Sequence, residues 1–449
     1  MNATIVNTNI IRDIDLSDQT IREKTRIVVL NSPEPDQKRT DINYYDFLVP
    51  SPKNEYLGSI SASEIKTGKS LKIKKLGENN LSSEIYRITF NETLGPDEKK
   101  SIKIEAIYTT KTDFTPKEVS LGEESYYKYS ENVYIESMYA TLKQKTIFKL
   151  PNKNIKKYSD SPAPVVKKDS QVIFGPYKNI NKDEKEEVTV LYFDMYPRVR
   201  ANRYTRTVTV SHWANTLGIS ENFAIINNSP NIKNFKRSTY AILGYSGKLI
   251  HAFTGSKFII PKDAHNIYFT DAIGNVSTSS IENTPRSKLL VTKARFPIVG
   301  GWKYSWDQGY HSYLKNYLKY NKSTNKYNLK TLFSCEFMNS PVRNYELHII
   351  LPEGARDIDV NIPFPVDSIE YEKIYSYLDF FGRTKIIIKK KNVVSELSKP
   401  ILVSYSYSIT DMLRKPFIVS AFFFALFLCR ITLGRIDYSL KRSKTLKKE

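Results

Sequence analysis

The sequence predicts a mainly β protein with a single C-terminal transmembrane helix and a short basic tail. Several segments alternate apolar and polar residues with the period of two that a half-buried strand shows, while helical periodicity is scarce. One run near the C-terminus is the only stretch apolar enough to enter a bilayer. The chain has 449 residues, so the part ahead of that run is long enough for two or three domains.

Strands are expected in both halves of the chain. Their patterns alternate apolar with charged, hydroxyl or aromatic side chains at residues 26–30, 101–107, 207–210, 346–351, 385–389 and 403–407. Clusters of Pro, Gly and polar residues at 32–35 and 352–354 indicate turns between them. The best soluble helix candidate is 311–320, where Tyr313, Leu314, Tyr317 and Leu318 would share a face.

A polar, charged stretch at 178–187 interrupts the strands near the middle of the chain, and we place a domain boundary just after it, around Pro197. The expected organisation is a first β domain at 1–196, a second at 197–411, a transmembrane helix at 412–434 and a basic tail at 435–449.

The membrane span rests on the run from Phe417 to Leu433. Eleven of its residues are Leu, Ile, Val or Phe. Each contributes about −0.3 to −0.6 kcal/mol to insertion, which together outweighs the roughly +3 kcal/mol of Arg430. A helix from Pro416 to Gly434 would be about 28 Å long, close to the hydrocarbon thickness of about 30 Å. A buried core helix is the alternative, but five Phe with no polar face suit lipid better. The expected anchor residues are Phe417, Phe422, Phe423, Phe424, Phe427 and Leu433.

Charges beside the span predict its orientation. Six Lys and Arg follow it against Asp437 and Glu449, whereas Arg414 and Lys415 on the other side are partly offset by Asp411. The more basic flank is expected in the cytosol, and the bulk of the chain in a lumen. Residues 1–19 have no apolar core of a secretory signal. Three explanations stay open: the signal has been removed, the start is missing, or a C-terminal anchor is used alone.

The net charge of +21 would ordinarily suggest an acidic partner such as nucleic acid. The Lys residues are scattered among many Asn, Ile and Tyr, and no nucleic-acid-binding motif accompanies them, so nucleic acid is not expected as a partner. Cys335 and Cys429 lie in the expected ectodomain and span, so they cannot pair.

Motifs for catalysis, metals and cofactors are missing from the sequence. Its five His lack the zinc-peptidase spacing, there is no nucleophile elbow, phosphate-binding loop or dinucleotide fingerprint, and Cys335 has no His nearby. We therefore expect no catalytic residue, no metal and no cofactor. His212 and Trp213 are interpreted as a packed core pair.

Glycan acceptor sequons occur at Asn2, Asn80, Asn91, Asn227, Asn275 and Asn321. Asn91 and Asn321 stand in polar surroundings and are plausible N-glycosylation sites if the body is lumenal. Asn227 is doubtful because Pro230 follows its Ser, and Asn275 belongs to a motif expected to be packed.

Blocks of the second half carry a resemblance to a known family. They read YFTDAIGNVSTS, RFPIVGGWK and LPEGA, followed by YLDFFGR, with VSHW ahead of them, at residues 268–279, 295–303, 351–355, 377–383 and 210–213. This order of motifs, with one anchor directly after the last β domain, closely resembles the ribophorin I family, a subunit of the oligosaccharyltransferase complex of the endoplasmic reticulum. The likeness covers Arg203 to Leu440 and is fainter before Tyr196.

The resemblance implies a single-pass type I membrane protein with two lumenal β-sandwich-like domains. Such a subunit is non-catalytic and supports a separate, polytopic catalytic subunit that transfers an oligosaccharide from dolichyl pyrophosphate to Asn of Asn-x-Ser/Thr sequons. The implied role is scaffolding and holding nascent polypeptides near the active site at the membrane of the endoplasmic reticulum. Residues 305–309 look like the catalytic subunit's sequon-reading motif, which we interpret as coincidence in a chain with one span. The short tail makes docking to a ribosome unexpected.

The family motifs also have a direct physical interpretation. Gly300 and Gly301 before Trp302 suggest a tight bend where backbone passes close to an aromatic ring. Asp271 and Gly274 suit a turn joining two strands. With His212, Trp213, Gly354 and Gly382, these residues are expected to be architectural. The alternatives are a single-pass binding or adhesion ectodomain and, less favoured, a peptidase with auxiliary β domains.

Overall fold

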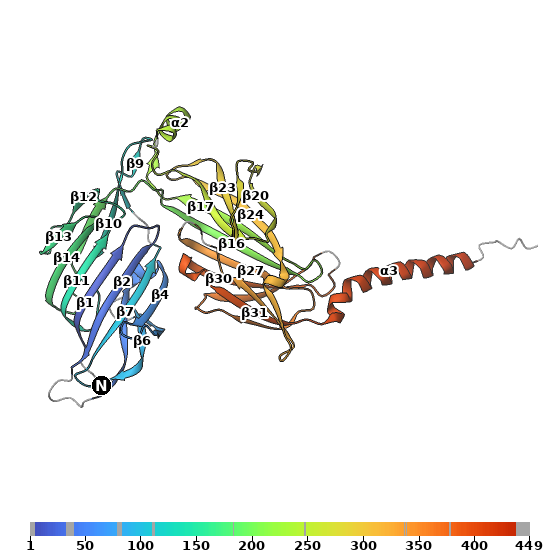
Figure 1. The fold of residues 1–449 in the computed structure, drawn as a ribbon, viewed down its shortest axis with the longest axis horizontal. Helices are drawn as coiled ribbons and strands as arrows, with labels where there is room; N and C mark the ends of the chain where they lie inside the picture. The colour runs from blue at the N-terminus through green and yellow to red at the C-terminus, as the bar shows by residue number, and fades with distance from the viewer. Residues whose placement is uncertain are drawn as a thin grey trace, which may run out of the picture.

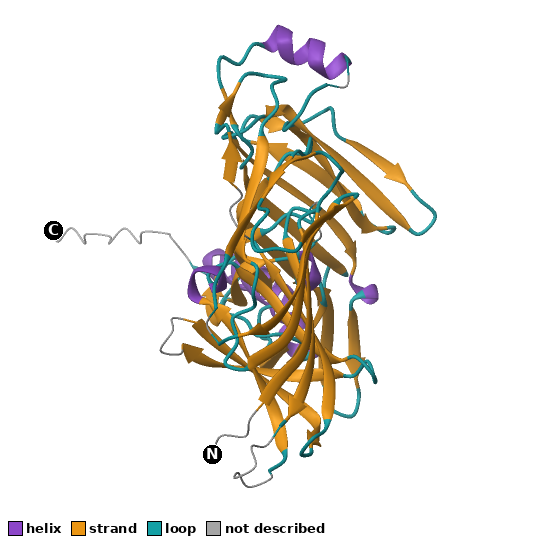
Figure 2. Cartoon of the chain, turned by 90° about the vertical axis from the view of Figure 1, so that its left-hand side faces the viewer, coloured by secondary structure: helices purple, strands orange, loops and turns teal. Residues whose placement is uncertain are grey.

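A computed structural model describes residues 5–32, 40–78, 83–109, 113–182, 184–246, 248–335, 337, 339–376 and 379–436. Strands form the bulk of the molecule in both views, and one long helix projects from it (Figure 1; Figure 2). The predicted fold class, mainly β with two sandwich-like bodies and a single C-terminal apolar helix, is confirmed. Asn2, Asn80, part of the predicted turn at 32–35, Tyr377 and residues 437–449 of the predicted tail lie outside the described residues.

The first half of the chain forms what we call the N-terminal body. A ten-stranded sheet with the order β13-β14-β11-β1-β2-β7-β4-β5-β6-β3 shares one hydrophobic core with a four-stranded sheet, β12-β15-β10-β8. A side chain of the edge strand β3 reaches β1 near the other end of the strand order: the Tyr45 hydroxyl donates to Asn7 Oδ1 at 3.3 Å. The strands are β1 Ile5–Asp15, β2 Ile21–Asn31, β3 Ile42–Pro50, β4 Leu57–Glu64, β5 Ser70–Glu78, β6 Ser83–Leu94, β7 Lys99–Tyr108, β8 Asp113–Thr115, β10 Tyr126–Asn132, β11 Ala140–Lys149, β12 Ile155–Tyr158, β13 Val165–Lys168, β14 Gln171–Ile180 and β15 Glu187–Tyr192.

The second half forms the C-terminal body. Its eight-stranded sheet has the order β21-β20-β24-β17-β16-β27-β30-β29 and shares a core with the sheets β19-β23-β22 and β25-β26-β31-β28. Phe223 stacks between Tyr204 and Trp306 at the centre of this core. The strands are β16 Val199–Ser211, β17 Thr216–Asn227, β19 Phe253–Pro261, β20 His265–Asp271, β21 Gly274–Asn275, β22 Ser280–Asn283, β23 Ser287–Ile298, β24 Lys303–Tyr313, β25 Leu318–Asn321, β26 Lys326–Leu332, β27 Val342–Ile350, β28 Arg356–Asn361, β29 Ser368–Ile374, β30 Arg383–Val393 and β31 Pro400–Ser406.

The predicted strands are found where the alternation placed them. Residues 26–30 lie in β2, 101–107 in β7, 207–210 in β16, 346–350 in β27, 385–389 in β30 and 403–406 in β31. In β16, buried and half-buried residues alternate almost throughout, as expected for a strand that presents one face to the core. The turn at 352–354 is also present.

The prediction of a helix at 311–320 is wrong. Residues up to Tyr313 continue β24, a 3-10 turn covers Leu314–Asn316, and β25 follows. The pairing of β24 with β17 along its whole length outweighs the weak helical pattern, because a central strand position satisfies the backbone hydrogen bonds of these residues. The described helices are α1 Ser51–Asn54, α2 Arg237–Tyr245 and α3 Ile409–Arg435, with a further 3-10 turn at Ser395–Leu397.

The two bodies meet along a hydrogen-bonded junction. The short strand β9 Glu118–Val119 pairs in parallel with β18 Asn231–Ile232, which joins a loop of each body. The buried guanidinium of Arg198 donates to the backbone oxygens of Asp18 and Leu16 across the same junction. Main-chain acceptors fix this geometry, so the bodies are held together by specific contacts and not by the linker alone.

Candidate functional site at the base of the C-terminal helix

The helix α3 leaves the C-terminal body as an isolated rod (Figure 1). Ser408 caps it, since its Oγ accepts from the backbone N–H of Asp411 at 3.2 Å. The helix is long and apolar enough to cross a membrane, and none of its most apolar window is buried in the protein. The predicted anchor residues Phe417, Phe422, Phe423, Phe424, Phe427 and Leu433 are all exposed on it. Lipid is the environment that such side chains suit.

Three of the motif residues lie at the base of α3. Trp213 Nε1 donates to the backbone oxygen of Met412 at 2.7 Å. Gly354 has φ 92°, and the side chain of Asp411 occupies the space where a Cβ would stand. A Cβ added to Gly354 would lie 2.7 Å from Asp411 Cγ. His212 Nε2 lies 2.9 Å from the Tyr405 hydroxyl at the end of the last strand before the helix. These contacts attach the first turn of α3 to the C-terminal body.

Trp213 differs from the sequence interpretation. His212 packs among the rings of Tyr327, Tyr405 and Tyr407, and burial lowers its pKa. The indole of Trp213 is 56% exposed, so the expected packed core pair is wrong for this residue. Neighbours on a strand or turn point in different directions, and the local sequence does not show which of the two faces solvent.

Charged side chains reinforce the base of the helix. The buried carboxylate of Asp411 contacts Arg356 at 3.2 Å and Arg414 at 2.5 Å. Asp379, from the loop before β30, pairs with Lys415 at 2.5 Å and with Arg383 at 3.2 Å. Burial alone would raise the pKa of Asp379, but these partners outweigh it and hold the pKa below its ordinary value. Two carboxylates from the body and the helix thus neutralise the cations that precede the span.

Gly382 and Glu353 shape the same loop. Gly382 has φ 73° and lies against the ring of Tyr375. The buried Glu353 Oε1 accepts from the backbone N–H groups of Phe380 and Phe381, both at 2.7 Å. A cavity of about 230 Å³ opens between this loop, Trp213 and α3. Glu353 and Asp379 belong to the motifs LPEGA and YLDFFGR, but sequence reasoning did not single them out, because their partners are far away in the chain.

The other motif residues lie elsewhere. Asp271 Oδ1 accepts from the backbone N–H groups of Ile273 and Gly274, which makes the predicted turn between β20 and β21. Arg295 donates to both oxygens of Asp271, at 2.7 and 2.9 Å. These bonds hold the pKa of Asp271 well below its usual range. These contacts hold the turn between β20 and β21 in its conformation.

Gly300 and Gly301 form the expected bend, but the close neighbour differs. A Cβ on Gly300 would lie 1.7 Å from the backbone oxygen of Pro230, and Gly301 has φ 82°. The prediction of an aromatic ring at this point is therefore wrong for Gly300, since backbone approaches backbone. Trp302 packs nearby against Phe235.

The sequons have different environments. Asn91 is exposed on β6, and Asn321 is half-buried at the end of β25, where its Oδ1 accepts from Ser323. Asn227 is fully buried, and its amide donates to the backbone oxygens of His251 and Ile298, both at 2.8 Å. Asn275 is exposed, so the expectation of packing is wrong there.

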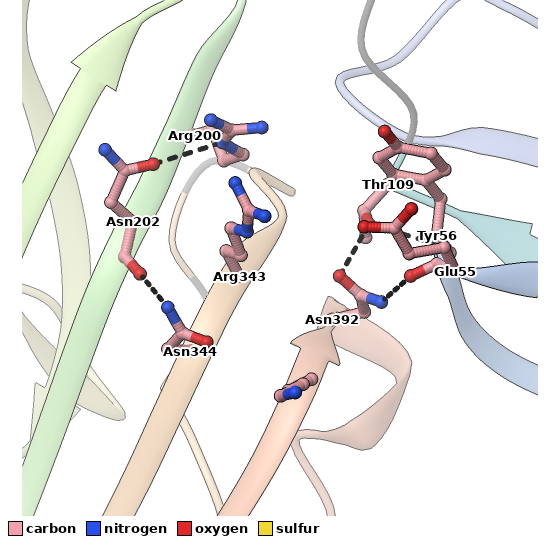
Figure 3. A pocket seen from close by; sticks show the side chains of 9 residues that line it. Glu55, Tyr56, Thr109, Arg200, Asn202, Arg343, Asn344 and Asn392 are labelled. Carbon is pink, nitrogen blue, oxygen red and sulfur yellow. Dashed lines mark hydrogen bonds between the residues drawn. The ribbon is translucent and has the colours of Figure 1, made fainter.

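A second cavity, of about 430 Å³, lies between the bodies (Figure 3). Arg200, Arg343 and Lys391 line it from the C-terminal body, opposite Tyr56 and Thr109. Burial and the charge of Arg343 lower the pKa of Arg200. Within the described ranges none of the three cations forms an ion pair, and Glu55 is the one acidic residue of the lining, so the cavity carries net positive charge.

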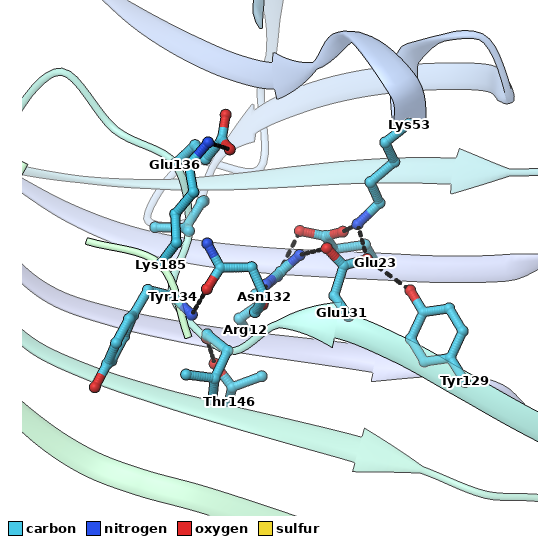
Figure 4. Close-up of polar contacts among 12 residues, drawn as sticks. Arg12, Glu23, Lys53, Tyr129, Glu131, Asn132, Tyr134, Glu136, Thr146 and Lys185 are labelled. Carbon is cyan, nitrogen blue, oxygen red and sulfur yellow. Dashed lines mark hydrogen bonds and ion pairs between the residues drawn. The ribbon is translucent and has the colours of Figure 1, made fainter. Parts of the chain in front are cut away.

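Buried charges inside the N-terminal body are mutually neutralised (Figure 4). Glu23 pairs with Arg12 and with Lys53, each at 2.7 Å, and Lys53 also reaches Glu131 at 2.7 Å. Burial alone would raise the pKa of Glu23, yet Arg12 and Lys53 lower it to about 2. Tyr129 donates to Glu131 at 2.7 Å. Each carboxylate oxygen in this group has a structural partner, so the group stabilises the fold.

In the fragment at 305–309, Trp306, Gln308 and Gly309 face the core of the C-terminal body, while Ser305 and Asp307 are exposed. Trp306 is buried and its Nε1 donates to Gln308 Oε1 at 3.0 Å, while Gln308 donates to Glu221 at 2.9 Å. An indole already bonded inside a core cannot contact an acceptor peptide. Among the described residues no group of three or more His, Cys, Asp or Glu is placed to hold a metal, and both cysteines are free.

Comparison with known proteins agrees with this architecture. The family model described as Ribophorin I matches residues 5–434. Subunit 1 of dolichyl-diphosphooligosaccharide–protein glycosyltransferase from Caenorhabditis elegans is 29% identical over 435 residues, which cover 96% of this chain and 72% of that protein. Subunit 1B from Arabidopsis thaliana is 29% identical over 362 residues, covering 80% and 76%, and subunit 1A is 28% identical over 448 residues, covering 98% and 71%. The match includes both bodies and nearly all of α3, and the chain therefore belongs to the ribophorin I family.

Proposed function

We propose that this chain is an accessory, non-catalytic subunit of an oligosaccharyltransferase complex in the membrane of the endoplasmic reticulum. The observation that carries the proposal is the family match across residues 5–434, together with relatives named as subunit 1 of that glycosyltransferase. The complex transfers an oligosaccharide from dolichyl pyrophosphate to Asn of Asn-x-Ser/Thr sequons in nascent proteins.

The role is scaffolding and acceptor retention. The acidic clusters of the described residues are engaged in ion pairs or turns, as at Glu23, Asp271 and Asp379, which supports a structural part in the complex. Residues 1–196 and 197–411 act as two units joined by hydrogen bonds, and they offer a large β surface to nascent chains and neighbouring subunits. The exposed face of α3 supplies contacts with the spans of a polytopic catalytic subunit.

Both bodies face the lumen and residues 435–449 face the cytosol in this proposal. The support is the excess of Lys and Arg after the span, which favours the cytosolic side.

Affinity purification of the tagged chain from digitonin extract, with mass spectrometry of the partners, tests the assignment. A polytopic transferase subunit should be recovered in stoichiometric amount, and depletion of the chain should leave secretory proteins underglycosylated. A matched variant with residues 412–434 replaced by a leucine-rich span keeps the body and the anchor but removes the native helix surface. Loss of partners from this variant alone would assign the contact to α3.

A single-pass adhesion ectodomain is the competing function. It predicts surface exposure of the intact chain and no transferase subunit in the pull-down. Transfer of an oligosaccharide to a peptide by the purified chain alone would contradict the non-catalytic role.

A further inference from the structure

We propose that the loop tip formed by Phe380 and Phe381 inserts into the headgroup region of the bilayer that α3 spans. The two rings are 71% and 57% exposed, and they contact each other edge to face with centroids 4.8 Å apart. Exposed paired Phe side chains are unusual on a surface that faces only water. The inference rests on the membrane span and holds whatever complex the chain joins.

The fold holds this tip in place with the rings outward. Glu353 is only 5% exposed, and its carboxylate accepts from the backbone N–H groups of both Phe residues. These hydrogen bonds attach the backbone of the tip to the C-terminal body. Ser376 N–H donates to Asp379 at 2.7 Å, which closes the loop on its other side. Because the backbone is fixed, the rings cannot withdraw into the core to escape solvent.

Two contacts give the position of the tip along α3. Lys415 Nζ lies 2.5 Å from Asp379, and the guanidinium of Arg414 lies 4.8 Å from the ring centroid of Phe381. Phe417 begins the apolar run three residues after Arg414, so the helix residue whose side chain contacts Phe381 lies about 5 Å before that run at 1.5 Å per residue. The headgroup region on each side of a bilayer is about 5 to 8 Å thick. Arg414 therefore falls within that region, and the ring of Phe381 lies beside its guanidinium.

The helix has little freedom to slide away from this position. The run from Phe417 to Leu433 is about 26 Å long as a helix, slightly less than the hydrocarbon core of about 30 Å. A shift of the bilayer toward the body by one turn would bring Arg414 and Lys415 into hydrocarbon, and a shift of the bilayer the other way would expose Phe417 and its neighbours. The boundary between hydrocarbon and headgroups thus determines the position of both the apolar run and the loop tip.

Neighbouring side chains have the chemistry of a membrane interface. Trp213 is exposed beside Met412, and an indole at headgroup level is a common anchor. Arg414 and Lys415 lie at the same level, where Asp411 and Asp379 neutralise them. Exposed aromatic rings beside charges that are already paired suit the boundary between headgroups and hydrocarbon, where a ring can contact both.

Spin labelling of the full chain tests the proposal. In a background with Cys335→Ala and Cys429→Ala, single labels are placed by Phe381→Cys, Phe380→Cys, Tyr245→Cys and Phe424→Cys, and the chain is reconstituted alone in phosphatidylcholine nanodiscs. Tyr245 is 99% exposed on α2 and serves as the aqueous reference, while Phe424 lies within the span and serves as the lipid reference. Collision rates with oxygen and with a water-soluble nickel chelate are measured by power saturation.

The labels at 380 and 381 should collide with oxygen several-fold more, relative to the nickel chelate, than the label at 245, and less than the label at 424. Either position alone suffices if the other variant fails to fold. Labels at both positions that match the aqueous reference would overturn the proposal, and so would protection from both reagents, since that result means burial against protein.

Discussion

Asn392 and Thr109 share a side-chain hydrogen bond of 3.1 Å although 283 residues separate them in the chain. The bond crosses the junction between the two bodies, and the Asn392 amide also donates to the backbone oxygen of Glu55 at 2.6 Å. A Cβ added to Gly58 would lie 2.6 Å from the backbone oxygen of Asn392, so the two backbones are in direct contact. Asn392 is therefore a specific connection between the bodies.

Asn392→Ala should lower the free energy of unfolding by about 2 to 5 kcal/mol. Two hydrogen bonds are lost at about 0.5 to 1.5 kcal/mol each, and Asn392 has φ 53°, a conformation that is about 1 to 2 kcal/mol less favourable for Ala. Urea denaturation of the full chain in detergent micelles measures the change.

Two control variants separate these terms. Asn392→Gly deletes the same hydrogen bonds but tolerates the positive φ, so it should lose less stability than Asn392→Ala. Asn215→Ala carries only the strain, because Asn215 has φ 50° in an exposed turn. Equal effects of Asn392→Ala and Asn215→Ala would show that the two hydrogen bonds of Asn392 contribute nothing.

His251 should make the junction sensitive to mild acid. Burial lowers its pKa to about 4, and its ring packs against Tyr127 and Phe193 of the N-terminal body. The unfolded chain takes up the proton near the ordinary pKa of about 6.5 and the folded chain only near 4, so stability is complete above pH 6.5 and falls as the pH decreases toward 4. Each pH unit in this window removes about 1.4 kcal/mol, or about 2 kcal/mol between pH 6.5 and 5.

The substitution His251→Asn should flatten that dependence. Asn cannot titrate and tolerates the φ of 56° at this position. Denaturation curves at pH 7.5 and pH 5 supply the measurement. Glu23 does not interfere, since its pKa of about 2 places its own contribution below pH 4.5. An unchanged slope in the variant would assign the acid sensitivity to another group.

Glu23→Gln should be strongly destabilising, by about 3 to 5 kcal/mol, because it leaves the buried guanidinium of Arg12 without its closest carboxylate. The same substitution at Glu118, which forms an exposed pair with Lys233 at 3.5 Å, should leave the free energy of unfolding nearly unchanged. The comparison holds the chemistry of the substitution constant and varies burial. Similar small effects at both sites would mean that the buried network relaxes around the lost charge.

Much of the fold could be predicted because its signals are local. The alternation at 101–107 and 207–210 reports one buried face of a strand, and the apolar run from Phe417 reports a span without reference to the rest of the chain. The segment 311–320 could not be predicted this way. Its strand is decided by pairing with β17, about a hundred residues earlier.

The candidate site was predicted only in part, for the same reason. His212, Trp213, Gly354 and Gly382 were identified through motifs, but the sequence did not show that they meet at the base of α3. Glu353, Asp379 and Lys415 come together only after the body has folded. The exposure of Trp213 depends on which side of its turn packs against the body, and no periodicity encodes that choice.

Glycan occupancy should follow exposure and orientation. Asn91 should be modified and Asn227 should not, because the Asn227 amide is buried and donates two hydrogen bonds. Deglycosylation with a peptide N-glycosidase converts each occupied Asn to Asp, which mass spectrometry locates. Asn91→Gln should remove one glycan, whereas Asn227→Gln should leave the glycan mass unchanged. An unmodified Asn91 in chain isolated from the endoplasmic reticulum would count against the lumenal orientation.

Gly354→Ala should loosen the first turn of α3. The new methyl group would lie 2.7 to 2.8 Å from Cγ and Cβ of Asp411, whose contacts with Arg356 and Arg414 hold the helix to the body. Gly274→Ala is the matched control, because Gly274 also has positive φ but has no atom within 4 Å of the added group. Both variants carry backbone strain of about 1 to 2 kcal/mol, and only Gly354→Ala adds the clash. Tryptic cleavage after Arg414 should therefore accelerate in Gly354→Ala alone, and equal cleavage of the two variants would show that the contact of Gly354 with Asp411 does not hold the helix.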